Sequence, residues 1–361
     1  MKKHLIKKIF FVFVILTLGS CKDPAVFYTI SQEEKQLEPL IKGSPTNFVN
    51  FNSKMYVGSG TTLYRYNRRN PDKPAQGDWT PFTPGGNIRQ LAATNAVMYA
   101  LCGEPPDEFI LKKSTDGSIW NNVSLPAGIT VQAIYAINNQ LFVGTGTFGS
   151  FSIYYYNGTN FTKLADSQDK LLNGAVFLNS KYYLSVNSLS TESGGIYTSS
   201  LTESGTQVIA EGNFMGIINL GSSIAAISRS GVLYEVTDSG VIQRAVLDDK
   251  KLATGALLVW NDTLLLAGRQ DEMRFDINYL HGYRELELSS GSIKEGAVFR
   301  DPGLFSLTTV ENNATYKSTL EKNPIKHLFK ADDGTLFAST YTNGVWSYRK
   351  RDDRWQWNSE Q

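Results

Sequence analysis

Cysteine and histidine are scarce in this chain of 361 residues, which contains two cysteines and three histidines. Two cysteines can form at most one disulfide, so a small disulfide-stapled scaffold is excluded. Zinc sites need clustered Cys and His ligands at paired spacings, which this sequence does not have. We therefore predict no metal site and no cofactor. Cys102 ends the apolar run Val97–Leu101 and is predicted to be a buried small residue rather than a nucleophile.

Charge is also low, because charged residues make up 19% of the chain and 35 basic residues face 34 acidic ones. A net charge of +1 gives no electrostatic reason to expect a nucleic-acid partner. Hydrophobic residues make up 41%, which excludes disorder. The abundance of Gly (31), Phe (19) and Tyr (18) favours turn-rich β structure.

Long apolar runs are missing except near the start, where Ile9–Leu18 follows four lysines. This run has about half of the ~20 residues that a membrane-spanning helix needs, so residues 1–20 are predicted to be a secretory leader. The sequence Leu18-Gly19-Ser20-Cys21 resembles the lipobox of bacterial lipoproteins. That resemblance implies cleavage between Ser20 and Cys21, acylation of Cys21, and the lipid bilayer of a bacterial cell envelope as a partner, on either membrane. The alternative is an ordinary signal peptide that happens to contain a cysteine.

A short polar turn between two apolar stretches recurs along the chain. The first residues of successive turns are 43, 43, 41, 42 and 40 positions apart. Asn, Asp and Gly tolerate the left-handed backbone of tight hairpin turns, which explains why they recur here. The turns are Asn52-Ser53, Asn95-Ala96, Asn138-Asn139, Asn179-Ser180, Gly221-Ser222 and Asn261-Asp262.

The sequence around these turns repeats as well. Gln140–Gly144 echoes Lys54–Gly58, a Tyr-rich strand such as Leu63–Tyr66 follows, and an aromatic residue marks a fourth strand. A period of about 40 residues with four short strands is typical of β-propellers. We predict an all-β fold, a β-propeller of four-stranded blades over residues 48–358.

The number of blades and the closure of the ring are less clear from sequence. A turn at Asp301-Pro302-Gly303 would give an eighth hairpin, but it precedes the Asp333-Gly334 turn by only 32 residues. Seven or eight blades therefore stay open. Residues 21–47 are predicted to form a lipid-anchored N-terminal segment. Within it, Val26–Ile30 is a candidate strand that completes the last blade and closes the ring.

The segment from Ser114 to Trp120 resembles the Asp-box of sialidase-type propellers, although it is one residue shorter. The resemblance implies a structural turn. Ser114 and Asp116 satisfy backbone groups, Gly117 lies in the turn, and Trp120 packs between strands. The Phe-Arg-Ile-Pro type motif that sialidases carry near their start is absent, so this turn supports the fold rather than catalysis.

Propellers usually bind ligands on the face that carries the loops between second and third strands and the connections between blades. The longest departure from the repeat, Gly268–Gly282, falls on such a loop. It carries Arg and aromatic residues typical of recognition surfaces, and these are the candidate binding residues Arg269, Arg274, Phe275, Tyr279 and His281. The alternative is a solvated insertion folded along the rim.

The leader, Cys21, the segments Phe27–Ser31 and Lys42–Asn47, and the ending Gly344–Arg349 together resemble the β-propeller lipoproteins of spirochaetes, particularly treponemes. This resemblance implies location and architecture and brings no catalytic residues. We expect a non-enzymatic binding, adhesion or envelope-interaction scaffold with an unknown protein or glycan ligand on its loop face. The alternatives are a sialidase-like propeller glycoside hydrolase and a structural subunit of an envelope assembly.

Overall fold

The computed structural model describes residues 40–67, 79–103, 109–147, 150–168, 170–188, 194–201, 207–237, 240–247, 251–271, 282–300, 320, 323–351 and 354–360. These residues form 28 β-strands and no α-helix. Within these ranges there is accordingly no helix long and apolar enough to cross a membrane. The all-β class predicted from composition and turn chemistry is confirmed.

The strands form seven antiparallel sheets of four, and in each sheet the strand order follows the sequence. Blade 1 is β1 (Phe48–Phe51), β2 (Lys54–Ser59), β3 (Thr62–Tyr66) and β4 (Trp79–Phe82). Blade 2 is β5 (Ile88–Ala93), β6 (Met98–Cys102), β7 (Ile110–Ser114) and β8 (Asn121–Asn122). Blade 3 is β9 (Val131–Ile137), β10 (Gln140–Thr147), β11 (Ser150–Tyr156) and β12 (Phe161–Gln168). Blade 4 is β13 (Lys170–Leu178), β14 (Lys181–Ser188), β15 (Gly195–Ser199) and β16 (Gln207–Glu211).

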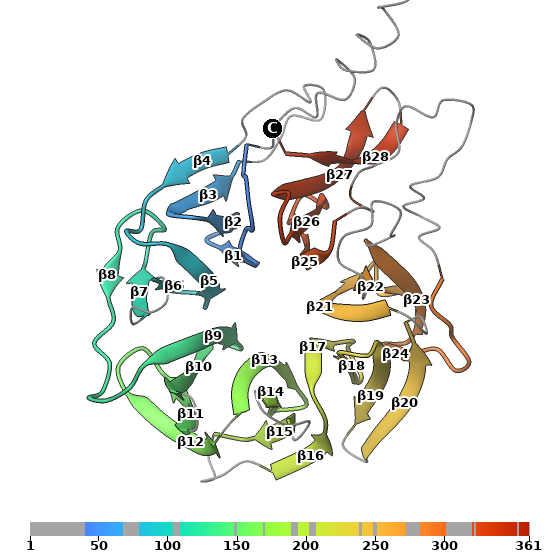
Figure 1. The fold of residues 1–361 in the computed structure, drawn as a ribbon, viewed down its shortest axis with the longest axis horizontal. Coiled ribbons are helices and arrows are strands. Elements are labelled where there is room, and N and C mark those ends of the chain that lie inside the picture. Colours follow the sequence, from blue (N-terminus) through green and yellow to red (C-terminus); the bar gives the residue numbers. More distant parts are fainter. Residues whose placement is uncertain are drawn as a thin grey trace, which may run out of the picture. The chain divides into compact units, whose positions relative to one another are not determined.

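Blade 5 is β17 (Phe214–Asn219), β18 (Ile224–Ser228), β19 (Val232–Thr237) and β20 (Gly240–Val246). Blade 6 is β21 (Lys251–Trp260), β22 (Leu264–Asp271), β23 (Tyr283–Ser289) and β24 (Ser292–Ile293). Blade 7 is β25 (Ile325–Lys330), β26 (Leu336–Thr340), β27 (Val345–Arg351) and β28 (Arg354–Ser359). Figure 1 shows the first strand of every blade facing the centre of a ring. The described strands thus form a seven-bladed β-propeller, and the turn at Asp301 that suggested an eighth hairpin lies outside the described residues.

The recurrent polar turns join the first and second strands of the blades. Four of the six have positive φ at both central residues, as in Asn52 (φ 49°) and Ser53 (φ 55°). The turn at Asn95 differs, because Thr94 closes it with a backbone bond to the Val97 carbonyl at 2.9 Å and a side-chain bond to the same oxygen. We call the end of the propeller with these turns the hairpin face, and the opposite end, with the blade-to-blade connections, the loop face.

Apolar packing between neighbouring blades holds the ring together. Seven clusters of buried side chains occupy the seven interfaces between adjacent blades. The sequence echo at Gly58 and Gly144 has its cause here. A Cβ on Gly58 would lie 2.9 Å from Ile88 of the next blade, and one on Gly144 would lie 2.8 Å from Leu172 of the next. Only glycine lets the second strand approach its neighbouring blade this closely.

A polar side chain on or directly before the innermost strand of several blades links that blade to the next one. In each case this side chain directly precedes a buried apolar residue of that strand. Asn47 Oδ1 accepts from the Leu91 amide at 3.0 Å, and Gln90 Oε1 accepts from the Ile134 amide at 3.0 Å. His327 in blade 7 plays the same part, because its Nδ1 accepts from the Phe48 amide of blade 1 at 3.3 Å. Each link satisfies a backbone donor of the following blade, which fixes the height of one blade against the next.

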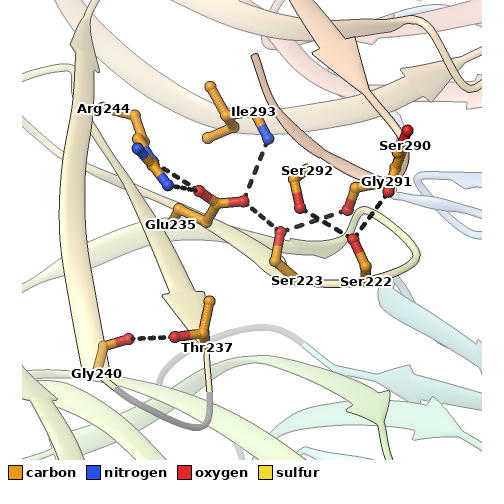
Figure 2. Close-up of polar contacts among 10 residues, drawn as sticks. All are labelled: Ser222, Ser223, Glu235, Thr237, Gly240, Arg244, Ser290, Gly291, Ser292 and Ile293. Carbon is orange, nitrogen blue, oxygen red and sulfur yellow. Dashed lines mark hydrogen bonds and ion pairs between the residues drawn. The ribbon is translucent and has the colours of Figure 1, made fainter. Parts of the chain in front are cut away.

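The interface between blades 5 and 6 contains a buried carboxylate that is paired with a partly exposed arginine, drawn in Figure 2. Glu235 of β19, 1% exposed, accepts hydrogen bonds from Arg244 Nε and Ser223 Oγ, each at 2.6 Å, and from the Ile293 amide of blade 6 at 3.2 Å. Burial raises the pKa of this carboxyl, but the bonds from Ser223, Arg244 and Ile293 outweigh burial and hold the pKa below its ordinary value. A charge buried with all of these partners is compensated, and it ties the two blades together.

The ring closes between blades 7 and 1 through the last residues of the chain. Glu360, fully buried after β28, accepts a hydrogen bond from Trp79 Nε1 of blade 1 at 2.8 Å and another from Ser347 Oγ. Its backbone carbonyl accepts from the Leu40 amide at 2.8 Å. The outer strand of blade 7 is therefore the C-terminal β28. Val26–Ile30, expected from sequence to complete the last blade, lies outside the described residues.

Candidate functional site

A large hollow lies on the loop face, where blades 7, 1 and 2 meet. Its volume is about 690 Å³, within the range of small-molecule sites. It is lined by the segment before β1, the end of β2, the starts of β5 and β25, and the residue after β26. The lining residues are Leu40, Lys42, Gly43, Ser44, Ser59, Gly60, Tyr64, Asn87, Ile88, Arg89, Lys326 and Tyr341.

Backbone hydrogen bonds fix the walls of this loop-face pocket. The Gly344 amide of blade 7 donates to the Gly43 carbonyl at 2.9 Å, and the Ile88 amide of blade 2 donates to the Gly60 carbonyl at 2.7 Å. Buried Thr46 accepts a bond from the Gly58 amide through its Oγ1 at 2.9 Å. The pocket is thus bounded by three blades whose relative positions are set by closure of the ring, so its shape is built into the fold.

Three cationic side chains, Lys42, Arg89 and Lys326, line the pocket, and none of the described lining residues is Asp or Glu. Lys326 Nζ donates to Ser44 Oγ at 3.3 Å. Burial lowers the pKa of Lys326 from its ordinary value, and the positive charge of Arg89 lowers it further. Three cations without a described acidic residue in the lining give the pocket a positive potential on a chain that is close to neutral overall.

The pocket also offers apolar and hydroxyl surface. Tyr64 and Tyr341 belong to its lining, and Tyr341 is 41% exposed. Ser44, Ser59 and Asn87 add neutral hydrogen-bonding groups. Tyrosine rings give a ligand a flat apolar contact at low conformational cost. These groups together can bind and orient a ligand, because the cations and hydroxyls offer polar contacts and the aromatic rings offer apolar contact area.

Sequence reasoning missed this site, because its residues are spread from Leu40 to Tyr341. A signal does exist in the repeat. Arg89 stands six residues before Asn95 and Lys326 six residues before Asp332, in the matching sequences Ile88-Arg89-Gln90-Leu91 and Ile325-Lys326-His327-Leu328. Aligning the blades on their turns places the two cations at equivalent positions of the innermost strands.

Of the loop predicted to bind, the structure describes only the two ends, residues 268–271 and Gly282. Arg269 belongs to strand β22 and is 4% exposed, so it is a buried strand residue rather than part of an exposed loop. Its amide donates to the Gly282 carbonyl at 3.0 Å, which pairs the two ends of the β22–β23 connection. Arg274, Phe275, Tyr279 and His281 lie outside the described residues, as do Ser20 and Cys21.

The Asp-box-like turn follows β7 on the hairpin face. Asp116 Oδ1 accepts from the amides of Ser118 at 2.8 Å and Ile119 at 2.9 Å, and Ser114 Oγ accepts from the Gly117 amide at 2.8 Å. These backbone bonds hold the pKa of Asp116 far below its ordinary value. Gly117 has a φ of 80°, and a Cβ there would lie 2.7 Å from the Tyr56 hydroxyl oxygen of blade 1. Trp120 is half-buried against the apolar cluster between blades 1 and 2.

Two predictions about metal and thiol chemistry can be compared with the described part of the chain. No group of three or more His, Cys, Asp or Glu side chains gathers there in a way that could hold a metal ion. Cys102 is buried at the end of β6, and burial raises the pKa of its thiol to about 11. At neutral pH this thiol is protonated.

No protein-family model matches the chain, and no curated protein matches it in sequence. Solved structures match it in fold. YCF48 from Cyanidioschyzon merolae has a TM-score of 0.56 at 11% identity, over 86% of this chain and 96% of that protein. The WD40 β-propeller domain of Doa1 has a TM-score of 0.53 at 11% identity, over 87% and 96%. The GH74 xyloglucanase from Xanthomonas campestris has a TM-score of 0.58 at 14% identity, over 90% of this chain and 55% of that one. At these identities the likeness shows the propeller fold and nothing finer.

Proposed function

We propose that this protein is a lipid-anchored, extracytoplasmic β-propeller that binds ligands on its loop face without transforming them. The observation that carries the proposal is the pocket of about 690 Å³ at the junction of blades 7, 1 and 2. A closed ring holds its walls rigidly, which lowers the conformational cost of binding. The Asp116 turn is engaged with the backbone of its own hairpin on the other face, which fits a structural part.

The chemistry of the pocket supports binding over glycoside hydrolysis. Most glycosidases use two carboxyl groups that flank the scissile bond, one as acid and one as nucleophile or base, whereas sialidases use a Tyr nucleophile that a carboxylate activates. The described lining residues are instead cations, hydroxyls, an amide, tyrosines and small or aliphatic side chains. Such groups hold a ligand through charge, hydrogen bonds and ring contacts.

The anchor rests on the N-terminal sequence. Lysines, an apolar run and Leu18-Gly19-Ser20-Cys21 support cleavage before Cys21 and acylation of its sulfur. The likeness of the leader and the propeller sequence to spirochaete lipoproteins supports the same location in a bacterial envelope. Stable anchoring needs two acyl chains, since one chain binds membranes only marginally.

The experiment is metabolic labelling with an alkyne fatty acid, followed by membrane fractionation. We expect the natural chain to be labelled and sedimented with membranes, and Cys21→Ser to lose the label. Cys102→Ser is the matched control, because this buried thiol lies in the propeller and its loss leaves the label in place. Wild-type labelling of Cys21→Ser would overturn the anchor. Release of sialic acid from sialyllactose by the purified protein would overturn the non-catalytic part of the proposal.

A further inference from the structure

The loop-face pocket gathers three cationic side chains, Lys42, Arg89 and Lys326. Arg89 and Lys326 stand at equivalent positions of β5 and β25, on either side of blade 1. The charge of Arg89 acts on Lys326, since it is, after burial, a cause of the lowered pKa of Lys326. Two cations brought together repel each other, and an anion placed between them removes that repulsion.

Among the described residues, each of the two cations contacts a neutral side chain. Arg89 lies over the Phe109 ring at 6.0 Å from its centroid, and Lys326 bonds the Ser44 hydroxyl at 3.3 Å. Lys42 adds a third cation at the rim, and its carbonyl accepts a bond from Ser59. The guanidinium fork of Arg89 suits a planar or tetrahedral oxyanion, and the ammonium of Lys326 supplies a point charge.

The pocket is much larger than a bare ion. A volume of about 690 Å³ leaves room for a ligand body beside the charged group. Tyr64 and Tyr341 offer ring faces or edges, and Asn87 and Ser59 offer hydrogen bonds. A ring that carries hydroxyls and one oxyanion matches these surfaces better than an apolar or a positively charged molecule does.

We infer that the loop-face pocket binds organic oxyanions, with a carboxylate, sulfate or phosphate group held between Arg89 and Lys326 and the ligand body against Tyr64 and Tyr341. This inference rests on the proposed binding function and names its ligand class. The chemistry is shared by acidic sugars, sulfated sugars and sugar phosphates.

The test is isothermal titration calorimetry on the full chain in a nonionic detergent, with four ligands that share one ring. Glucuronate, glucose 6-sulfate and glucose 6-phosphate carry the anion in three forms, and glucose carries none. We expect at least one of the charged sugars to bind and glucose to give no heat. The charged sugar that binds most tightly identifies the preferred anion. Inorganic phosphate should bind more weakly because it has no sugar ring to contact the tyrosines. Equal binding of glucose, or no binding of any charged sugar, would overturn the inference.

Variants assign the binding to the pocket. The double variant Arg89→Gln, Lys326→Gln should weaken binding of the charged sugar at least tenfold. The single variant Arg89→Lys, which keeps Lys326 and a positive charge at position 89, should lose less of the binding. Lys54→Gln is the matched control, because Lys54 lines a smaller hollow of about 240 Å³ with Asp332 and Asp333 on the hairpin face. Binding that survives the double variant, or falls equally in Lys54→Gln, would overturn the inference. Because fatty-acid labelling of Cys21 is measured separately, failure of anion binding is distinguishable from failure of the proposed anchor.

Discussion

Glu360, which follows β28, is predicted to lock the ring, and its removal should destabilise the whole propeller. In Glu360→Ala the Trp79 indole N–H and the Ser347 hydroxyl lose their acceptor in a buried site. Hydrogen bonds to a charged group are worth about 1.5–3 kcal/mol each. The backbone bonds from Leu40 and to Val345 remain, because alanine keeps its amide and carbonyl. We therefore expect a loss of about 3–5 kcal/mol in the free energy of unfolding.

Urea unfolding followed by tryptophan fluorescence measures this loss, and Trp79 itself reports on the interface between blades 7 and 1. Glu295→Ala is the matched control, because Glu295 is exposed after β24. The control should unfold within about 0.5 kcal/mol of the natural chain. If Glu360→Ala unfolds at the same urea concentration as Glu295→Ala, Glu360 does not hold the ring closed.

Four further perturbations test other parts of the fold. Gly144→Ala places a Cβ 2.8 Å from Leu172 and should cost about 1–3 kcal/mol by urea unfolding, and an unchanged midpoint would contradict the close approach of blades 3 and 4. Asp116→Ala should lower the thermal midpoint more than Asp116→Asn, which keeps one acceptor oxygen for the turn amides; equal midpoints would count against the turn geometry. Burial and the charge of Lys326 lower the pKa of His327 to about 4, below its ordinary 6.5, so folding stability should fall as pH drops from 6.5 to 4, and the fall should be smaller in His327→Gln. Cys102 should resist iodoacetamide in native protein at pH 7 and react in urea, whereas rapid native alkylation would contradict its burial.

Much of the propeller follows from the sequence because each blade repeats one local rule. The turn residues adopt positive φ at Asn138 and Asn139 as their chemistry demands, and the apolar runs beside them become buried strands. The Tyr-rich segment Leu63–Tyr66 falls within β3, the third strand of its blade. These features depend on residues that are neighbours in the sequence, so local sequence patterns predict them.

Closure of the ring and the loop-face pocket could not be read in the same way. The hydrogen bond between Trp79 and Glu360 joins residues 281 positions apart, and neither the turns nor the repeat period of the sequence predicts it. The pocket likewise combines cations from blades 2 and 7 with the segment before β1. Arg269 shows the reverse error, since a charged residue at the edge of a long connection looks exposed in sequence but lies buried within β22. Sites assembled from distant blades need the tertiary structure to bring them together.

Crystals of the protein soaked in selenate, an isostere of sulfate with an anomalous signal, give the most direct test of the loop-face pocket as an anion site. We predict an anomalous peak between blades 2 and 7, within hydrogen-bond reach of the Arg89 guanidinium and Lys326 Nζ, which disappears in the Arg89→Gln, Lys326→Gln variant. Selenate bound only at other positions, with the space between Arg89 and Lys326 empty, would contradict it.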